Sequence, residues 1–388
     1  MTLKPITIKS IQLHTVALPF VEVLKTSFGS DPYKVTVLVE VTTAEGQHGW
    51  GEITVEVSPG YASETPVVAE HIAVNFLIPK LIGKQISDPA EATKIMRPVR
   101  GFEHAKFGIE AAIWDALAKR NEMRLADLFA SFLPPGNEPR PAANVGVSIG
   151  IKESVEATIA TIQKRYNEGY RRIKLKIQPG WDVDFARAIR AALPDIVMML
   201  DANSAYTLKD ADHLKKLDDL NLLMIEQPLA ETDIWEHSKL QPMLKTPICL
   251  DESIKSANDL RLAIHLGALR VLNLKPVRVG GYVESLEIYR VCVENSLPLW
   301  IGGMMETGVG RAANVAFASL PGVTMPCDIS ATNRYYEPDL TEPPFVLGAG
   351  STLAVPSGAG IGIEVQMDRI EAGKRYWQER VPYAPLSV

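Results

Sequence analysis

The sequence predicts an α/β protein built from a (β/α)8-type barrel, a modified TIM barrel, and an N-terminal α+β capping domain. Three observations support this fold class. Beyond residue 140, short apolar runs alternate with helical patterns seven or more times. Charged residues close five consecutive runs at intervals of 24 or 25 residues, and the first third of the 388-residue chain follows a different pattern.

The capping domain is predicted over residues 1–135. Two β-rich segments, 6–18 and 35–55, come first, and the second contains a glycine-bearing turn typical of an antiparallel sheet. Helical patterns follow at 66–83 and 104–121. The stretch FLPPGNEPRPAAN is rich in proline and glycine and marks the boundary, and we expect residues 340–388 to pack back on this domain.

The barrel is predicted over residues 140–335. Its apolar runs include VGVSIGI, RIKLKI, DIVMMLD, LLMIE, PICLD, VLNLK and PLWIGG, and a helical segment follows each. An open doubly wound sheet remains an alternative. It is less favoured, because no GxGxxG motif follows a first strand.

Five charged residues end consecutive predicted strands: Lys176, Asp201, Glu226, Asp251 and Lys275. In a barrel all strands run the same way, so these side chains should meet at the C-terminal mouth, where such enzymes place their chemistry. A strand-ending carboxylate can also cap the following helix. Five charges in register are difficult to explain as independent caps.

The three carboxylates imply a cation. Like charges brought close together raise one another's pKa unless a positive charge binds them. Ligands that are all oxygen, with no neighbouring cysteine or histidine, favour Mg²⁺, and Mn²⁺ is a possible substitute.

The run RIKLKI places Lys174 and Lys176 on one face of a strand, opposite the three apolar residues. A half-exposed strand with a solvated face is the simpler interpretation of this pattern alone. Counting strands, however, puts Lys176 on strand 2 and Lys275 on strand 6, on opposite sides of an eight-stranded ring. Burial, the cation and Lys174 would all disfavour protonated Lys176, and a neutral lysine is a base.

The overall composition points to small-molecule ligands. A net charge of -6, a pI near 5.8 and the lack of a basic run give no reason to expect nucleic acid or membrane partners. The three cysteines, Cys249, Cys292 and Cys327, suggest neither a disulfide framework nor a zinc site. With no targeting or membrane-spanning pattern found, a cytoplasmic location is expected.

These motifs resemble the enolase superfamily and its muconate lactonizing subgroup, which carries KxK on strand 2 and a lysine on strand 6. KLKIQPGWD, LDANSAY, EQPL, LNLKPVRVGG and WIGGMMETGVGRAAN are most similar to the o-succinylbenzoate synthase and N-succinylamino acid racemase family, although GGMMETGVGRAAN departs mildly from its pattern. The resemblance implies that Lys176 and Lys275 are acid/base catalysts and that Lys174 contacts the substrate carboxylate. Asn203 and Glu252 would support them.

The resemblance also implies proton abstraction next to a carboxylate, through an ene-diolate. Dehydration in menaquinone synthesis and racemisation are both compatible with it, as are cycloisomerase and dipeptide epimerase activities. A histidine base is disfavoured, because His213, His237 and His265 lie in helical segments. Arg278, a fixed cation near Lys275, would tune the pKa of that lysine. Members of the family tend to assemble, so a homo-oligomer is expected.

Specificity should come from capping-domain loops over residues 20–33 and 55–63. The candidate substrate contacts are Phe28, Tyr61, Ser148, Met304 and Met305, although aromatic residues and methionines are also common in cores. Two other classes stay open. One is a barrel enzyme that uses a Schiff-base lysine, and the other is a non-catalytic binding protein.

Overall fold

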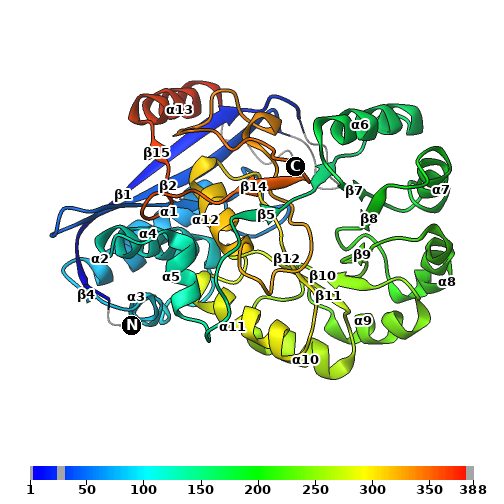
Figure 1. Cartoon of the computed structure of the whole chain (residues 1–388), viewed down its shortest axis with the longest axis horizontal. Coiled ribbons are helices and arrows are strands. Elements are labelled where there is room, and N and C mark those ends of the chain that lie inside the picture. The colour runs from blue at the N-terminus through cyan, green and yellow to red at the C-terminus, as the bar shows by residue number, and fades with distance from the viewer. Residues whose placement is uncertain (1–2, 24–30, 382–388) are drawn as a thin grey trace.

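The computed structural model describes residues 3–23 and 31–381 (Figure 1). Phe28, a predicted substrate contact, lies outside the described residues, together with the rest of residues 24–30 in the 20–33 loop.

A four-stranded antiparallel sheet forms the core of the N-terminal region, in the order β3-β2-β1-β4. Its long strands β1 and β2 pair from Ile8 to Pro19, with one irregularity between Ile8 and Ser10. The strands are β1 (Ile6–Pro19), β2 (Tyr33–Thr43), β3 (His48–Ile53) and β4 (Gln85–Ile86). The helices are α1 (Pro66–Ile72), a π-helical turn (Ala73–Leu77), α2 (Ile78–Leu81), α3 (Pro89–Met96), α4 (Glu103–Arg120) and α5 (Leu125–Ser131).

Helix α4 lies directly against strand β3. Residues 104–118 are buried apart from Lys106, which fits the nearly continuous apolar sequence of this helix. The close approach depends on two glycines of β3. A Cβ at Gly51 would lie 2.1 Å from the carbonyl oxygen of Gly108, and one at Gly49 would lie 2.1 Å from that of Ala112. Any larger side chain would push the helix away from the sheet.

Seven parallel strands form the second sheet, in the order β12-β11-β10-β9-β8-β7-β6. They are β6 (Val147–Ile149), β7 (Arg172–Lys176), β8 (Val197–Asp201), β9 (Ile225–Glu226), β10 (Ile248–Leu250), β11 (Val271–Leu274) and β12 (Leu299–Ile301). The segment 324–328 occupies the eighth position. It bonds to β12 through Asp328 N and Ile301 O, 2.9 Å apart, and to the chain before β6 through Gly146 N and Cys327 O, 2.7 Å apart. The ring of a (β/α)8-type barrel is thereby closed, and the predicted fold class is confirmed.

Helices α6 to α11 surround these strands on the outside of the ring (Figure 1). The helices of this part are α6 (Val155–Glu168), α7 (Val183–Ala192), α8 (Ala211–Leu214), α9 (Ile234–Leu240), α10 (Ala257–Leu266), α11 (Tyr282–Glu294) and α12 (Gly308–Ala318). Short 3-10 turns cover Leu208–Asp210, Lys215–Leu220, Gln241–Met243 and Thr332–Arg334.

The C-terminal segment returns to the first part of the chain. Strand β14 (Thr352–Ala354) pairs with β5 (Ala142–Asn144), and β13 (Thr341–Glu342) pairs with β15 (Glu364–Val365). Helix α13 (Met367–Arg380) lies beside β1, where a Cβ at Gly373 would be 3.0 Å from Val16 Cβ (Figure 1). The boundaries proposed near residues 135–140 and 335–340 stay predictions.

Two buried carboxylates of the N-terminal region hold helix starts of the barrel. Glu110, on α4, accepts hydrogen bonds from Tyr282 N and from Val283 N at 3.1 Å, at the start of α11. Glu52, at the end of β3, accepts from Thr307 N and Gly310 N, at the start of α12. Burial raises the pKa of both carboxyls, that of Glu110 to about 7. These contacts fix the capping domain on the barrel, which determines where its loops stand over the mouth.

Replacing Glu110 should therefore destabilise the protein. Glu110→Ala leaves two backbone donors at the start of α11 without an acceptor, which costs about 2–3 kcal/mol of unfolding free energy. Urea unfolding measures this loss, and the exposed Glu138→Gln is the matched control. A Glu110→Ala protein as stable as the control would mean that these contacts contribute nothing.

Candidate active site

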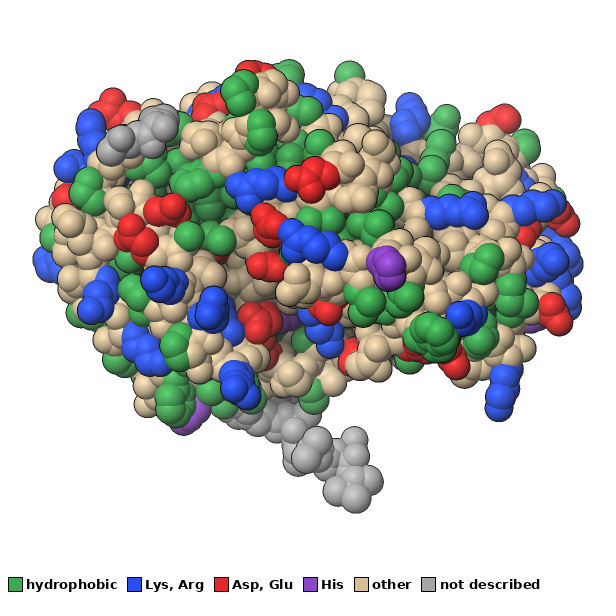
Figure 2. Space-filling view, turned by 90° about the horizontal axis from the view of Figure 1, so that it is seen from below, with side chains coloured by type: hydrophobic (Ala, Val, Ile, Leu, Met, Phe, Trp, Pro, Cys, Tyr) green, Lys and Arg blue, Asp and Glu red, His purple; other side chains and the backbone are tan. Residues whose placement is uncertain are grey.

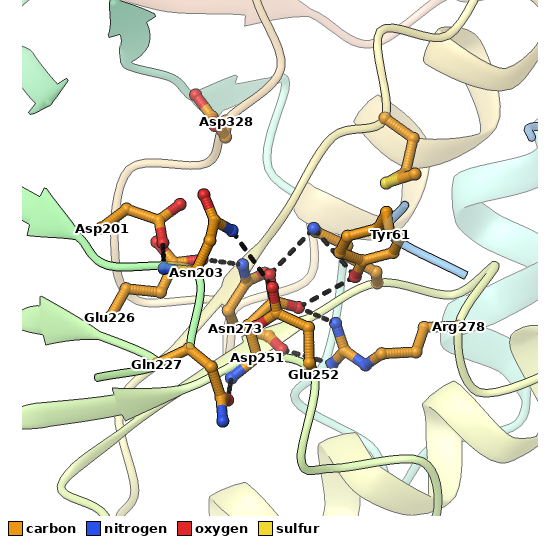
Figure 3. Close-up of polar contacts among 12 residues, drawn as sticks. Tyr61, Asp201, Asn203, Glu226, Gln227, Asp251, Glu252, Asn273, Arg278 and Asp328 are labelled. Carbon is orange, nitrogen blue, oxygen red and sulfur yellow. Dashed lines mark hydrogen bonds and ion pairs between the residues drawn. The ribbon is translucent and has the colours of Figure 1, made fainter. Parts of the chain in front are cut away.

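The five predicted charges stand at the C-terminal ends of five consecutive strands. Lys176 ends β7 and is paired in register with Asp201 at the end of β8, which is paired with Glu226 at the end of β9. Asp251 and Lys275 directly follow β10 and β11. Figure 3 shows the three carboxylates approaching one region from adjacent strands.

On one side of this region, both lysines of the KxK motif contact carboxylates. The Lys174 ammonium lies 2.9 Å from Asp201 Oδ2 and 2.7 Å from Glu226 Oε2. Lys176 Nζ donates to Asp201 Oδ2 at 2.7 Å and to Asn203 Oδ1 at 2.5 Å. Burial alone would lower the pKa of Lys174, but Asp201 and Glu226 raise it well above its usual value. Lys174 is therefore a fixed positive charge, as expected of a group that receives a carboxylate.

On the other side, Lys275 and Arg278 share Asp251. Lys275 Nζ lies 2.9 Å from Asp251 Oδ2 and donates to the Tyr61 hydroxyl at 3.0 Å. Arg278 donates to Asp251 Oδ1, to Ile254 O and to Asn273 O. Burial opposes protonation of Lys275, yet Asp251, Tyr61 and Glu252 together raise its pKa far above the usual value. Arg278 thus bonds the carboxylate that holds Lys275 and makes no bond to the lysine itself.

Asn203 and Glu252 connect the two sides. Asn203 Nδ2 donates to Glu252 Oε1 at 3.1 Å, while Asn203 Oδ1 accepts from Lys176. Asn203 has a φ of 41°, a left-handed conformation that asparagine tolerates better than most residues. Burial and then the negative charge of Asp251 raise the pKa of Glu252 to about 7. Both residues thus lie where a supporting role was expected.

Two amide side chains that position Glu226 and Asp251 had not been predicted. Asn273 Nδ2 donates to Glu226 Oε1 at 2.7 Å from β11, and Gln227 Oε1 accepts from Asp251 N at 3.0 Å. Gly302 leaves room for the first of them, since a Cβ there would lie 2.3 Å from Asn273 Oδ1. The two-residue alternation in VLNLK, which places Asn273 on the face of Lys275, was the signal for this residue.

Asp328 was also missed. It lies in the segment that fills the eighth position of the ring, accepts from Ser148 Oγ at 2.6 Å, and approaches Arg172 and Lys174 at 3.5 and 3.7 Å. Extending the count of strand ends to the apolar run before PCDIS would have predicted it.

The carboxylates also carry the chemistry of a divalent-cation site. Glu226 and Asp251 are buried, and neither Glu226 Oε2 nor Asp251 Oδ2 accepts a well-oriented hydrogen bond, although lysine nitrogens stand within 3 Å. Burial and the negative charge of Asp201 raise the pKa of Glu226 to about 8. Within residues 3–23 and 31–381, no three side chains of His, Cys, Asp or Glu are already arranged around one metal position. The donor set, all oxygen and short of positive charge at Glu226, fits Mg²⁺.

A cavity of about 70 Å³ opens onto these groups. It is lined by Glu56, Tyr61, Ser148, Lys174, Lys176, Asn203, Lys275, Gly303, Met304, Met305, Asp328 and Tyr335. We call it the reaction chamber. The predicted contacts Tyr61, Ser148, Met304 and Met305 therefore lie on its wall. A second cavity of about 600 Å³ also has Tyr61 on its wall.

Other sequence expectations concern residues away from the chamber. His213, His237 and His265 lie on α8, α9 and α10, and none of them lines the chamber. The three cysteines are free and buried. In the described part of the chain, no helix is both long and apolar enough to cross a membrane. On the face in Figure 2, basic and acidic side chains are interspersed.

Two family models match the chain. The model described as "Mandelate racemase / muconate lactonizing enzyme, N-terminal domain" matches residues 10–130, and "Enolase C-terminal domain-like" matches residues 157–369. An o-succinylbenzoate synthase from Geobacillus stearothermophilus is 43% identical over 91% of each chain. An N-succinylamino acid racemase from Amycolatopsis is 43% identical over 92% of this chain and 94% of the relative.

A solved structure gives the same result. A member of the enolase superfamily from Enterococcus faecalis V583 is 41% identical, with a TM-score of 0.87 over 95% of this chain and 98% of the other. Two domain models and relatives above 40% identity thus point to the same family. The chain belongs to the mandelate racemase / muconate lactonizing enzyme family of the enolase superfamily, and it is an enzyme.

Proposed function

We propose that the enzyme removes the proton next to a substrate carboxylate, with Mg²⁺ as cofactor and Mn²⁺ as a possible substitute. Its reaction is that of an o-succinylbenzoate synthase, an N-succinylamino acid racemase or both, since relatives with each name are equally similar to it. The observation that carries the proposal is the pair of amines, Lys176 and Lys275, at strand ends four strands apart, with three carboxylates on the strands between them.

Asp201, Glu226 and Asp251 would hold the cation. When bound, it stabilises the negative charge that proton removal leaves on the substrate carboxylate. Lys174, a fixed ammonium on the same wall, would donate to that carboxylate and set the orientation of the substrate. The α-carbon would then face both catalytic lysines.

In the forward step, Lys176 Nζ acts as the base and takes the α-proton, and the electron pair moves into the carboxylate to give an ene-diolate. If the substrate carries a hydroxyl on the β-carbon, Lys176 returns the proton to this leaving group, and water departs. Lys275 stabilises the anion throughout as an ammonium, in agreement with its raised pKa.

Without a leaving group, Lys275 Nζ returns a proton to the opposite face of the same carbon, which inverts the centre. A cycloisomerase or dipeptide epimerase could use the same groups, and the substrate decides between them. A Schiff-base lysine enzyme predicts trapping of Lys176 or Lys275 by borohydride with substrate, and a binding protein predicts no exchange at the α-carbon.

The domain boundaries of residues 1–135 and 140–335 belong to this proposal. So does the packing of residues 340–388 on the capping domain as one unit with it. A homo-oligomer, as the family resemblance implies, and a cytoplasmic location complete it.

Solvent exchange tests the proposed chemistry. In D₂O with Mg²⁺, the protein should exchange the α-proton of N-succinyl amino acids, dehydrate the cyclohexadiene precursor of o-succinylbenzoate, or do both, as followed by proton NMR. Lys176→Ala and Lys275→Ala should each reduce the active reaction about 10²–10⁴-fold, because each removes an acid/base group. Activity that survives both substitutions, or no reaction with any of these compounds, would refute the proposal.

Asn273 should determine how tightly the cation binds. Asn273→Leu keeps the side-chain size but removes the donor to Glu226 Oε1, so the carboxylate loses its fixed orientation. We expect Mg²⁺ to bind about 10–100-fold more weakly by calorimetry without substrate. Gln85→Leu, at an exposed site of the capping domain, is the control. Unchanged affinity in Asn273→Leu would exclude this role.

Arg278 should affect racemisation more than dehydration. Arg278→Gln removes the positive charge that shares Asp251 with Lys275, and only racemisation requires Lys275 to exchange a proton. We expect kcat for racemisation to fall at least about tenfold further than kcat for dehydration, with a displaced pH profile. Equal losses in the two reactions would contradict this assignment.

A further inference from the structure

A free carboxylate lies on the wall of the reaction chamber. Glu56, in the segment after β3, lines the cavity together with the catalytic lysines. The other charged groups of the wall are paired: Asp328 accepts from Ser148, and Lys174, Lys176 and Lys275 contact Asp201 or Asp251. Among the described residues, none forms an ion pair or a side-chain hydrogen bond with Glu56.

The segment that carries Glu56 is fixed at three points around it. His104 Nδ1 lies 2.8 Å from the carbonyl oxygen of Thr54, two residues before Glu56. Further along, the Tyr61 hydroxyl bonds to Lys275, and the Glu64 carboxylate accepts from His104 N at 2.9 Å. Glu56 therefore has a defined place relative to the two catalytic lysines.

Lys34, a basic residue of the capping sheet, interacts electrostatically with Glu56. It is buried on β2, and its Nζ has no hydrogen-bond partner among the residues described. Burial is the largest influence and lowers the pKa of Lys34, while Glu56 acts in the opposite direction. No ion pair joins the two groups, so Lys34 does not pair with the Glu56 carboxylate.

The remaining wall of the chamber is largely apolar, with Met304, Met305 and the rings of Tyr61 and Tyr335. A substrate that covers Glu56 with an apolar or anionic group would strip water from the carboxylate without replacing it, which is unfavourable. A substrate that presents an ammonium or guanidinium group would supply the missing counter-ion. The wall thus discriminates by charge as well as by size.

We propose that Glu56 makes the enzyme selective for substrates with a cationic group on a substituent of the α-carbon. This inference rests on the proposed proton-transfer function and names its substrate class. The cation can be carried by the side chain, as in an N-acylated lysine, or by the acyl group, as in a dipeptide with a free N-terminus. Both place an ammonium within the chamber while the α-carboxylate binds at Lys174.

Two matched pairs of compounds distinguish a cation on the side chain from a cation on the acyl group. Nα-succinyl-L-lysine and N-succinyl-L-norleucine differ at the end of the side chain, where only the first carries an ammonium. L-alanyl-L-norleucine and N-propionyl-L-norleucine differ by the ammonium of the acyl group. The kcat/KM for α-proton exchange in D₂O with Mg²⁺ is measured for each compound with the wild type, with Glu56→Gln, and with the exposed control Glu138→Gln.

In at least one pair, the wild type and the control should favour the cationic compound by about tenfold, the effect of one partly buried charge pair. Glu56→Gln should reduce this ratio to about one and leave exchange of the uncharged compound within about twofold. A variant that loses both the preference for the cationic compound and exchange of the uncharged compound would be misfolded. Circular dichroism and Mg²⁺ affinity are therefore measured on the same samples. Glu56→Asp, in a folded protein, should restore part of the preference.

A preference that Glu56→Gln leaves unchanged, or no preference for the cationic compound in either pair, would overturn the inference. So would a protein that dehydrates the cyclohexadiene precursor but exchanges none of the four compounds. If neither exchange nor dehydration occurs, the proposed function itself fails. The uncharged compounds therefore distinguish an error about Glu56 from an error about the reaction.

Discussion

The structure of the barrel mouth depends on one constraint: three carboxylates are buried together at the ends of neighbouring strands. Asp201, Glu226 and Asp251 come at the same end of neighbouring parallel strands, so the strands bring them together. Their negative charges repel one another in a buried region of low dielectric. Positive charge must offset this repulsion for the protein to fold. Lys174 does so on one side, and Lys275 with Arg278 on the other, which accounts for cations on the inner face of otherwise apolar strands.

The same balance links folding to chemistry. Lys174 and Lys275 keep their protons because they contact carboxylates, as the raised pKa of each shows. Glu226 is the least compensated of the three acids, with a pKa raised to about 8, so an additional cation is most needed there. A site that is short of positive charge at one carboxylate and rich in it elsewhere is suited to bind a divalent ion together with an anionic substrate.

The sequence predicted the parts of the site that periodicity controls. A spacing of 24 or 25 residues and the alternation within each strand were sufficient for the five charges, because both follow from the geometry of repeated βα units. Asn273 shares the alternation of VLNLK with Lys275, but it is uncharged and the search was for charged strand ends. Gln227 follows its apolar run and was missed for the same reason. Asp328 was missed because the count of strand ends was not continued to the eighth segment, which forms an isolated bridge between Val145 and Cys327 instead of a regular strand. Glu56 lies on a capping-domain loop, where no period relates a residue to the barrel.

The two domains both supply side chains to the wall of the reaction chamber, and these side chains are positioned in different ways. The barrel supplies groups whose positions are fixed by strand register, and the capping loop supplies Tyr61 and Glu56, whose positions depend on how the domain is docked. Tyr61 bonds to Lys275 and to Asp251 at 3.0 and 3.3 Å, so the loop that would recognise the substrate also contacts the reaction centre. Because of this contact, a change that moves Tyr61 also alters the surroundings of Lys275. The Tyr61 hydroxyl is thus the point where the capping loop and the charged groups of the barrel mouth meet.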